Sequence, residues 1–559
     1  MSDKVTVDEL GKQLHECADI MRGSVDKGKY KDYILPLVFY AEMNRRFEQK
    51  YRTEFEKSEV DENNREEFDD VFRDVASDEM AQGIVVPEGY EWEDLLDKEE
   101  GIASFIAEMF DEFENNNPGY GGFVQNKYAS VGSFTGGDGD TLLSDVIKII
   151  DDSIYKAEEV PSDMMGEAFM HLVRKFAREE AGEYFTPVQI VRLMVSLLEP
   201  YELQSSFHDP AVGSGGMLIE VSDQIRYRWE EQEWYREQNE NVSGIDDCDS
   251  FNEFQSRGGF RFTGQELNPT IASISMMNLA LRELDGDIRQ GNSLSSPQFS
   301  HGNELEEFDY IFSNFPFSES GWKTQTKNRV EQYGDLGWSD SLPHGNYGDF
   351  AFIMHMCSQL SDSGKVSTII PHGVLFRNGD QEYREYLIEN DMVEAIIGLP
   401  ENLFESTGIP SAILILNKNK PDDREGEVFF FNADHEGRFY RDTGNDRNVL
   451  LDPVAEGDVS NAVQYEQMNN PYGNAEIKSF FESWREEERV SRVVSVDEIR
   501  ENEYNLNIAL YVDTTEPQED ISVEDTLSTI HDLETEYESL NNQLTTYIQQ
   551  LNYEGENDE

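Results

Sequence analysis

One short segment constrains the fold more than any other, because it joins an apolar strand to a glycine-rich turn. The strand candidate is 206–209, and the turn that follows reads Asp209-Pro210-Ala211-Val212-Gly213-Ser214-Gly215-Gly216. Apolar residues at 217–219 then continue the chain as a helix. Glycines allow the backbone to turn tightly and to approach a ligand, as in nucleotide-binding βα units. We therefore predict that this turn forms one side of a ligand site.

The same alternation of short apolar strands and helices extends over the chain from about residue 160. Further strand candidates lie at 260–263, 310–313, 366–370, 393–397 and 412–416. Helical stretches separate these strands, and that order favours an α/β sheet with crossover connections. The predicted fold class is α/β, with a Rossmann-like domain over residues 151–480.

Both ends of the chain are predicted to be helical. In an N-terminal domain over residues 1–150, Leu10, Leu14, Ala18 and Met21 share one helical face. The tail, residues 481–559, has apolar residues at three- and four-residue steps, which is typical of a long amphipathic or coiled-coil helix. These residues are Leu527, Ile530, Leu533, Tyr537, Leu540, Leu544, Tyr547 and Leu551. Such a helix can pack on its own chain or on another subunit, and we favour another subunit.

The charge of the chain is extreme. Its 559 residues include 115 acidic and 45 basic ones, which gives a formal net charge of −70. The acidity is spread from end to end, which argues against a DNA mimic, and a hydrophobic content of 38% argues against disorder. We predict a halophilic protein, because in molar salt the Debye length falls to about 3 Å and carboxylates repel one another little. Contact with nucleic acid must then rely on a local cleft, on a partner subunit or on high ionic strength.

The sequence contains no apolar run of about 18 residues and no apolar signal segment, so we expect no membrane association and a cytoplasmic location. The cysteines, Cys17, Cys248 and Cys357, lie far apart and form no CxxC pair. We interpret them as structural thiols and predict no metal site.

Two further segments predict ligand contacts at strand ends. Glu266 follows the strand at 260–263, where a carboxylate can accept hydrogen bonds from both hydroxyls of a ribose. Asn292 follows a later strand-like segment and can bind an adenine edge, with Leu294 packing on the ring. The chain has neither GxGxxG nor a Walker-type GxxxxGK[ST] sequence, which argues against a dinucleotide enzyme and against an ATP-driven motor.

The segment Asn314-Phe315-Pro316-Phe317 closes the strand candidate at 310–313. The Asn side-chain oxygen and a neighbouring backbone carbonyl can both accept hydrogen bonds from one planar amine, and the last aromatic residue can stack on the ring that carries it. Such contacts raise the electron density on a weak nitrogen nucleophile. This pattern indicates a site for methyl transfer to an adenine amine.

Together these segments resemble the adenine-N6 DNA methyltransferases, and more specifically the modification subunit of type I restriction–modification systems. Residues 209–216 and 264–266 resemble cofactor-binding motifs of the family, and 314–317 resembles its catalytic motif. Segments 348–352, 371–377, 399–404 and 504–508 are also similar to the family.

Upstream, Thr186-Pro187 reads on its own only as a helix start. The resemblance adds a first cofactor-binding motif there, with the contacts Glu183, Tyr184, Phe185, Thr186 and Pro187.

The resemblance also implies a cofactor and partners. The cofactor is S-adenosylmethionine, the substrate is DNA, and a separate specificity subunit selects the target. A restriction subunit and a second copy of this chain complete the implied complex. The sequence departs from the family at Phe315, where the motif usually has proline, so the fixed φ of proline is lost while the backbone carbonyl remains.

Three alternatives share parts of this pattern. A stand-alone adenine methyltransferase would have the same motifs, but no basic, aromatic-rich recognition domain follows them. A protein glutamine methyltransferase uses a similar asparagine motif on an amide, and the helical N-terminal domain disfavours it. A catalytically weak assembly scaffold would keep the helices without the chemistry.

Overall fold

The structure is a computed structural model. It describes residues 7–26, 29–58, 72, 84–117, 137–155, 162–179, 186–199, 201–231, 251–256, 258–302, 304–318, 321–322, 347–404, 408–443, 448–450, 475–513 and 523–550. The chain divides into two compact units, Met1–Val512 and Asp513–Glu559. In the described residues no helix is long and apolar enough to cross a membrane.

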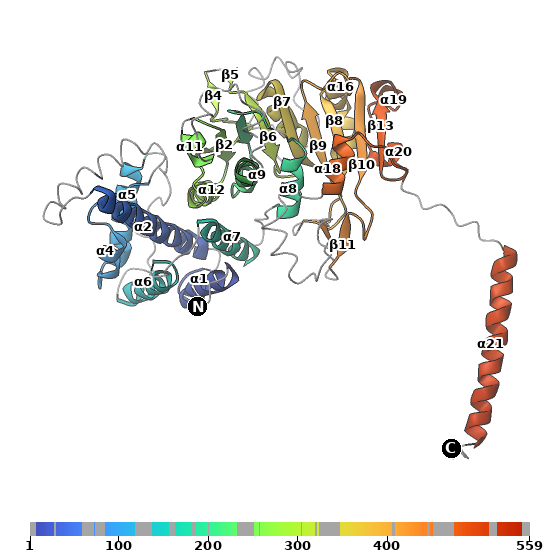
Figure 1. Cartoon of the computed structure of the whole chain (residues 1–559), viewed down its shortest axis with the longest axis horizontal. Coiled ribbons are helices and arrows are strands. Elements are labelled where there is room, and N and C mark those ends of the chain that lie inside the picture. The colour runs from blue at the N-terminus through green and yellow to red at the C-terminus, as the bar shows by residue number, and fades with distance from the viewer. Residues whose placement is uncertain are drawn as a thin grey trace. The chain divides into compact units, whose positions relative to one another are not determined.

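The first part of the chain is helical (Figure 1). The predicted face of the first helix is confirmed, because Leu10, Leu14, Ala18 and Met21 are all buried. The helices and one π-helical turn are α1 (Val7–Met21), α2 (Tyr30–Ser58), α4 (Trp92–Leu96), α5 (Ile102–Asn116), α6 (Gly137–Ile150), η5 (Asp151–Tyr155) and α7 (Ser162–Glu179).

A nine-stranded sheet lies within Met1–Val512, and its strand order is β13-β10-β8-β9-β7-β6-β1-β2-β3. The strands are β1 (Ser206–Asp209), β2 (Arg261–Glu266), β3 (Gly286–Gln290), β6 (Phe308–Ser313), β7 (Leu360–Pro371), β8 (Val393–Gly398), β9 (Ser411–Asn417), β10 (Glu427–Asn432) and β13 (Ser491–Ser495). In the described residues two short two-stranded sheets stand apart from it, namely β4 (Ser300–His301) with β5 (Glu304–Leu305) and β11 (Tyr440–Asp442) with β12 (Asn448–Leu450).

The six predicted strands are confirmed as β1, β2, β6, β7, β8 and β9. The neighbouring strands β3, β2, β1, β6 and β7 pair with one another in parallel. The strand β9 runs antiparallel to both of its neighbours, β7 and β8. The antiparallel strand was not predicted. The sheet also continues past residue 480, the predicted end of the catalytic domain, because β13 pairs with β10 at its edge.

Helices follow or separate the strands and cover them. They are α8 (Val188–Ser196), α9 (Gly216–Glu231), α11 (Phe251–Ser256), α12 (Pro269–Leu281), α14 (Asp349–Ser358), α15 (Gly373–Phe376), α16 (Gln381–Glu389), α18 (Ala475–Glu482), α19 (Val496–Glu501) and α20 (Ile508–Tyr511), with a 3-10 turn at Asn378–Asp380. Thr186 and Pro187 precede α8, and Pro187 is its N-cap, so the predicted helix start is confirmed.

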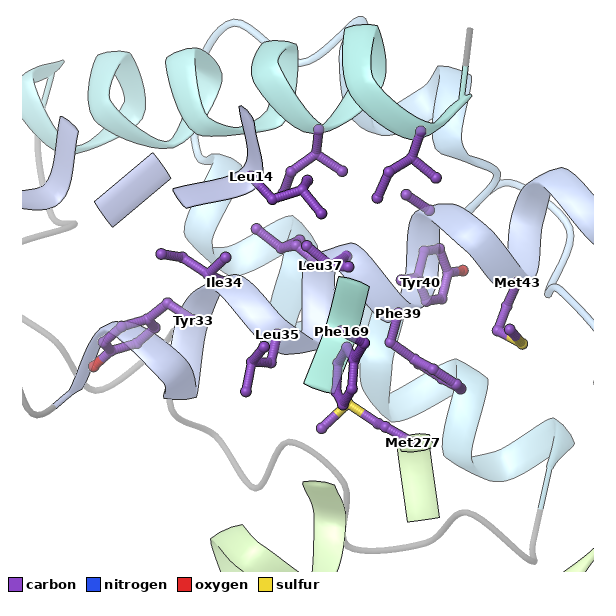
Figure 2. Close-up of a cluster of buried hydrophobic side chains, with 14 of the residues drawn as sticks. Leu14, Tyr33, Ile34, Leu35, Leu37, Phe39, Tyr40, Met43, Phe169 and Met277 are labelled. Carbon is purple, nitrogen blue, oxygen red and sulfur yellow. The ribbon is translucent and has the colours of Figure 1, made fainter. Parts of the chain in front are cut away.

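The helix α12 joins the N-terminal helices to the sheet. Its residue Met277 lies in one buried cluster with Leu14, Leu37 and Phe169 of the N-terminal helices (Figure 2). On the same helix, the Asn278 side-chain Nδ2 donates to the Ser214 carbonyl at 2.8 Å, in the glycine-rich turn. One helix therefore packs on the N-terminal helices and also holds the predicted ligand turn.

Within Asp513–Glu559, the helix α21 (Val523–Gln550) confirms the predicted amphipathic helix. Its apolar side chains are exposed where the structure describes them, namely Ile530, Leu533, Tyr537, Leu540, Leu544 and Tyr547. Leu551 lies outside the described residues.

Two of the cysteines are free and buried, Cys17 in α1 and Cys357 in α14. Burial raises the pKa of each thiol to about 12, so both stay protonated at neutral pH. Their interpretation as structural thiols is therefore confirmed, whereas Cys248 lies outside the described residues.

Candidate active site

The predicted site residues lie beside β1, where the order in which the chain adds strands to the sheet changes from one side to the other. The strand β1 pairs on one side with β2, which leads on to β3, and on the other side with β6. Ligands of such α/β sheets bind beyond the carboxyl ends of the strands at this position. The glycine-rich turn follows β1, and Asn314 follows β6. The topology therefore brings together two segments that are about a hundred residues apart in the sequence.

A buried carboxyl group joins the ends of these two strands. Asp209, the last residue of β1, is 2% exposed. Its Oδ1 accepts a hydrogen bond from the Ser313 hydroxyl of β6 at 3.1 Å and another from the Ala211 N–H at 2.9 Å. Asp209 is predicted to contact a ligand, but in the structure its bonded oxygen links β6 to the glycine-rich turn. This carboxyl group positions the two halves of the site.

Burial raises the pKa of Asp209 to about 7 from the usual 3.8, and the two hydrogen bonds oppose the rise only in part. The folded chain thus binds this proton more tightly than the unfolded chain does. The group's contribution to stability is full below pH 3.8 and is lost as the pH rises through 7. We expect Asp209→Asn, which keeps the acceptor oxygen, to gain melting temperature relative to the wild type between pH 5 and pH 8. Thermal unfolding of both proteins across this range checks the prediction, and a pH-independent difference between them contradicts it.

The glycine-rich turn needs glycine for two different reasons. Gly213 and Gly215 have φ values of 55° and 84°, which residues with a side chain rarely adopt. A Cβ on Gly215 would also lie 2.5 Å from Leu279 Cδ1 and 2.9 Å from Ser275 Oγ of α12. A Cβ on Gly216, by contrast, would meet nothing within 4 Å. Gly215 therefore packs against α12, while Gly216 borders open space at the start of α9.

Hydrogen bonds tie the loops after β1, β2 and β3 to one another. The Glu266 carboxylate accepts from the Gly213 N–H at 3.1 Å and from the Asn268 N–H at 2.9 Å. The Gly291 N–H donates to the Glu266 carbonyl at 2.8 Å, and the Ser293 hydroxyl donates to the Pro210 carbonyl. Each oxygen of Glu266 thus accepts a backbone hydrogen bond, so the carboxylate is held at the carboxyl end of β2 beside the glycine-rich turn.

The residues predicted to hold an adenine ring have a different placement. Asn292 Oδ1 accepts from the backbone N–H groups of Leu294 and Ser295 at 3.0 and 2.9 Å, so this oxygen shapes its own turn. Leu294 is 5% exposed and lies in a core cluster with Phe315. The structure leaves little of its side chain for a ligand. Leu267, for which no role was predicted, is 58% exposed and directly follows Glu266.

The side chain of Asn314 is oriented by a residue 128 positions away. Asn314 Nδ2 donates to the Thr186 hydroxyl at 2.8 Å. Thr186 precedes α8, and Asn314 follows β6, so the first predicted cofactor motif meets the predicted catalytic motif here. Because the amide nitrogen is directed toward Thr186, the opposite side of the amide presents its oxygen acceptor. The other predicted residues of that motif, Glu183, Tyr184 and Phe185, lie outside the described residues.

Phe315, which stands where the motif of the resembled family usually has proline, is held in place by packing. Its side chain is 1% exposed and stacks on Phe352 of α14, with ring centroids 5.0 Å apart and an interplanar angle of 7°. The rings of Phe317 and Phe315 form a T-shaped pair with centroids 6.0 Å apart. Phe317 is half-buried, and Pro316 is exposed. A buried aromatic pair adds about 0.5–1.5 kcal/mol beyond the area it buries. The aromatic pair therefore restrains the loop in place of the fixed φ of proline.

A second carboxyl group, which was not assigned a role from the sequence, holds the end of the loop that follows β6. Asp349 of α14 is 1% exposed, and its Oδ1 accepts from the Ser318 N–H at 2.7 Å. Its other oxygen forms an ion pair with Arg377, which also lies 3.3 Å from Asp380. Ser318 has a φ of 57°, so this hydrogen bond holds a turn that the backbone rarely adopts. The sequence signal was the family-like segment 348–352, although its spacing did not indicate this contact.

Comparisons with known proteins agree with this architecture. Residues 160–520 match the family model described as N-6 DNA Methylase, and residues 10–150 match the HsdM N-terminal domain. A type I restriction enzyme methylase subunit of Methanocaldococcus jannaschii, MjaVII, is 28% identical over 563 residues, which cover 98% of this chain and 85% of the relative. The HindI methylase subunit of Haemophilus influenzae is 28% identical and covers 75% of this chain and 85% of its own length.

A solved structure shows the same fold. The methyltransferase subunit of a type I restriction–modification system from Streptococcus thermophilus superposes with a TM-score of 0.68 at 23% identity, covering 91% of this chain and all of that one. The chain therefore shares its fold with a methyltransferase subunit. The chain belongs to the N-6 DNA methylase family and has the two matched domains of a type I methylase subunit.

Proposed function

We propose that the site binds S-adenosylmethionine and transfers its methyl group to N6 of an adenine that is rotated out of the DNA helix. The residues present suit this cofactor. The open space beside Gly216 allows a ligand to approach the turn, the Glu266 carboxylate can accept ribose hydroxyls, and the exposed Leu267 offers an apolar face to the adenine ring. When bound, the cofactor supplies an electrophilic methyl group on a positively charged sulfur.

The loop after β6 would hold the substrate amine. In this proposal Asn314 Oδ1 and the Phe315 carbonyl accept the two hydrogens of the adenine N6 amine, which increases the electron density on that nitrogen. The half-buried Phe317 stacks on the purine ring, and Pro316 limits the movement of the loop between them. The adenine must leave the helix at a cost of a few kcal/mol, because its N6 cannot be reached inside a duplex. Orientation of the amine supplies much of the rate acceleration.

The hydrogen bond from Asn314 Nδ2 to the Thr186 hydroxyl is the observation that best supports this assignment. It directs the amide nitrogen toward the protein and leaves the oxygen to accept from an amine. An amide-binding role, as in a protein glutamine methyltransferase, would use the same acceptors. The match of residues 10–150 to the HsdM N-terminal domain favours DNA.

The proposed complex contains a specificity subunit, a restriction subunit and a second copy of this chain. The known relatives carry the names of type I restriction enzyme subunits, which supports this assembly. The exposed apolar stripe of α21 is the surface that we propose to dock on a partner helix, because such a stripe on a helix in water is stabilised by burial against another helix.

Mapping of N6-methyladenine in genomic DNA by single-molecule sequencing tests the proposed function. We expect one recurring sequence to be methylated in cells that carry the intact gene and unmodified after its deletion. Restoring the gene on a plasmid should restore the modification at the same sequence. Unchanged methylation after deletion, with no site lost, would refute the proposal.

A further inference from the structure

Large apolar side chains that are exposed are rare in the described residues outside α21. They are Leu267, Tyr347, Phe376, Ile409 and Leu510. Two of them, Phe376 and Ile409, lie in segments next to the carboxyl end of β7, the strand that neighbours β6 in the sheet, and Tyr347 contacts Arg377, which follows Phe376. Phe376 ends the short helix after β7, and Ile409 precedes Pro410, whose carbonyl accepts from the His372 N–H at 3.0 Å. Exposed apolar groups therefore concentrate near the catalytic loop.

Tyr347 is attached most directly to that loop. Its ring is 50% exposed and lies over the Arg377 guanidinium, with 4.9 Å between the guanidinium carbon and the ring centroid. Arg377 is held by the carboxylates of Asp349 and Asp380, and Asp349 in turn binds the Ser318 N–H. One chain of contacts thus connects the ring to the residue that follows Phe317.

The charges around Tyr347 favour a base over a phosphate as its ligand. The two carboxylates neutralise Arg377, so this cation has little capacity left for a phosphate. The whole chain carries a net charge of −70, which opposes phosphate contacts in general. Stacking of a base on an aromatic ring needs no net charge and contributes substantially to the binding of unpaired bases. A half-exposed ring backed by a fixed guanidinium suits such stacking.

We propose that Tyr347 is a stacking subsite for a nucleobase next to the everted adenine, with Phe376 and Ile409 as its apolar rim. The proposal rests on the proposed methyl transfer to DNA and adds a contact that recognises no particular base. It places part of the DNA-binding free energy in stacking near the catalytic loop. The interaction is therefore less sensitive to salt than contacts between lysine or arginine and phosphates.

The test compares Tyr347→Ala with Tyr347→Phe in the complete complex of this chain with its specificity subunit, on a duplex that carries the mapped site. We expect Tyr347→Ala to raise KM for DNA about tenfold, as the loss of one base–aromatic stack predicts. Tyr347→Phe, which keeps the ring, should stay within about twofold of the wild type. KM for S-adenosylmethionine should not change in either variant. The slope of log KM for DNA against log salt should also stay unchanged, because no phosphate contact is lost.

A second measurement uses the wild-type complex and does not depend on the folding of a variant. Duplexes with 5-iodouracil at each position flanking the target adenine are irradiated, and the crosslinked peptide is identified by mass spectrometry. Crosslinking to Tyr347 supports the subsite. Crosslinking only elsewhere, together with an unchanged KM for DNA in Tyr347→Ala, overturns it.

Loss of the specificity subunit from Tyr347→Ala in size-exclusion chromatography also overturns it, because the surface would then bind protein. A wild-type complex that methylates no DNA refutes the proposed function instead.

Discussion

Replacing Asn314 with alanine is expected to lower the rate of methyl transfer about a thousandfold, as the loss of a preorganised hydrogen-bonding group at a reacting centre does in other enzymes. The affinity for S-adenosylmethionine should stay within about twofold of the wild type, since our assignment gives Asn314 to the substrate amine and not to the cofactor. Single-turnover methylation with a labelled methyl donor measures the rate, and calorimetry measures the affinity. Full activity in this variant would refute the role of Asn314.

The matched control is Thr186→Val, which removes the acceptor of the Asn314 amide and nearly preserves the side-chain volume. Asn314 Nδ2 donates to the Thr186 hydroxyl at 2.8 Å, so this variant leaves the amide free to rotate. We expect the rate to fall by about tenfold, much less than in Asn314→Ala, because the oxygen acceptor is still present in part of the population. An equal loss in both variants would instead indicate that Thr186 itself contacts the substrate or cofactor.

Alanine at Gly215 is expected to destabilise the protein and abolish cofactor binding. The φ of 84° strains a residue with a side chain, and a Cβ at 2.5 Å from Leu279 Cδ1 and 2.9 Å from Ser275 Oγ would force these side chains to shift. Backbone strain and overpacking together should lower the free energy of unfolding by about 3 kcal/mol. Thermal unfolding and calorimetric titration with S-adenosylmethionine measure the two effects.

Gly216→Ala provides the comparison for this prediction, because its new Cβ would meet nothing within 4 Å. Its melting temperature should equal that of the wild type. Its affinity for S-adenosylmethionine should fall about tenfold if a ligand approaches the turn at this position, since one methyl group then overlaps the ligand. If Gly215→Ala and Gly216→Ala behave alike in both measurements, the assignment of separate packing and ligand-facing roles is wrong.

Much of the sheet could be predicted because its strands are short apolar runs between helices. The strand β10 was not predicted, although residues 428–431 read Val-Phe-Phe-Phe, an apolar run that is typical of a buried strand. The antiparallel direction of β9 has no such signal. Its residues 412–416 are apolar in the same way as those of the parallel strands, and only pairing between distant segments decides the direction.

The candidate site was predictable in its residue types but not in its internal contacts. The glycine-rich turn, Glu266 and Asn314 could be selected because each follows a strand, and strand ends meet at one edge of a parallel sheet. The roles of Thr186, Asp209 and Asp349 depend on hydrogen bonds between residues that are far apart in the sequence. Burial of Leu294 and exposure of Leu267 likewise depend on packing, which no local pattern expresses. The halophilic character remains a prediction from composition alone.

A structure of the complex with S-adenosylmethionine and a duplex containing the mapped adenine is the most direct test of the proposed site. We expect the ribose hydroxyls to lie within hydrogen-bonding distance of the Glu266 carboxylate, and the everted adenine N6 to lie between Asn314 Oδ1 and the methyl group. A cofactor bound away from the glycine-rich turn, or an adenine amine that contacts neither Asn314 nor the Phe315 carbonyl, would contradict the proposed arrangement.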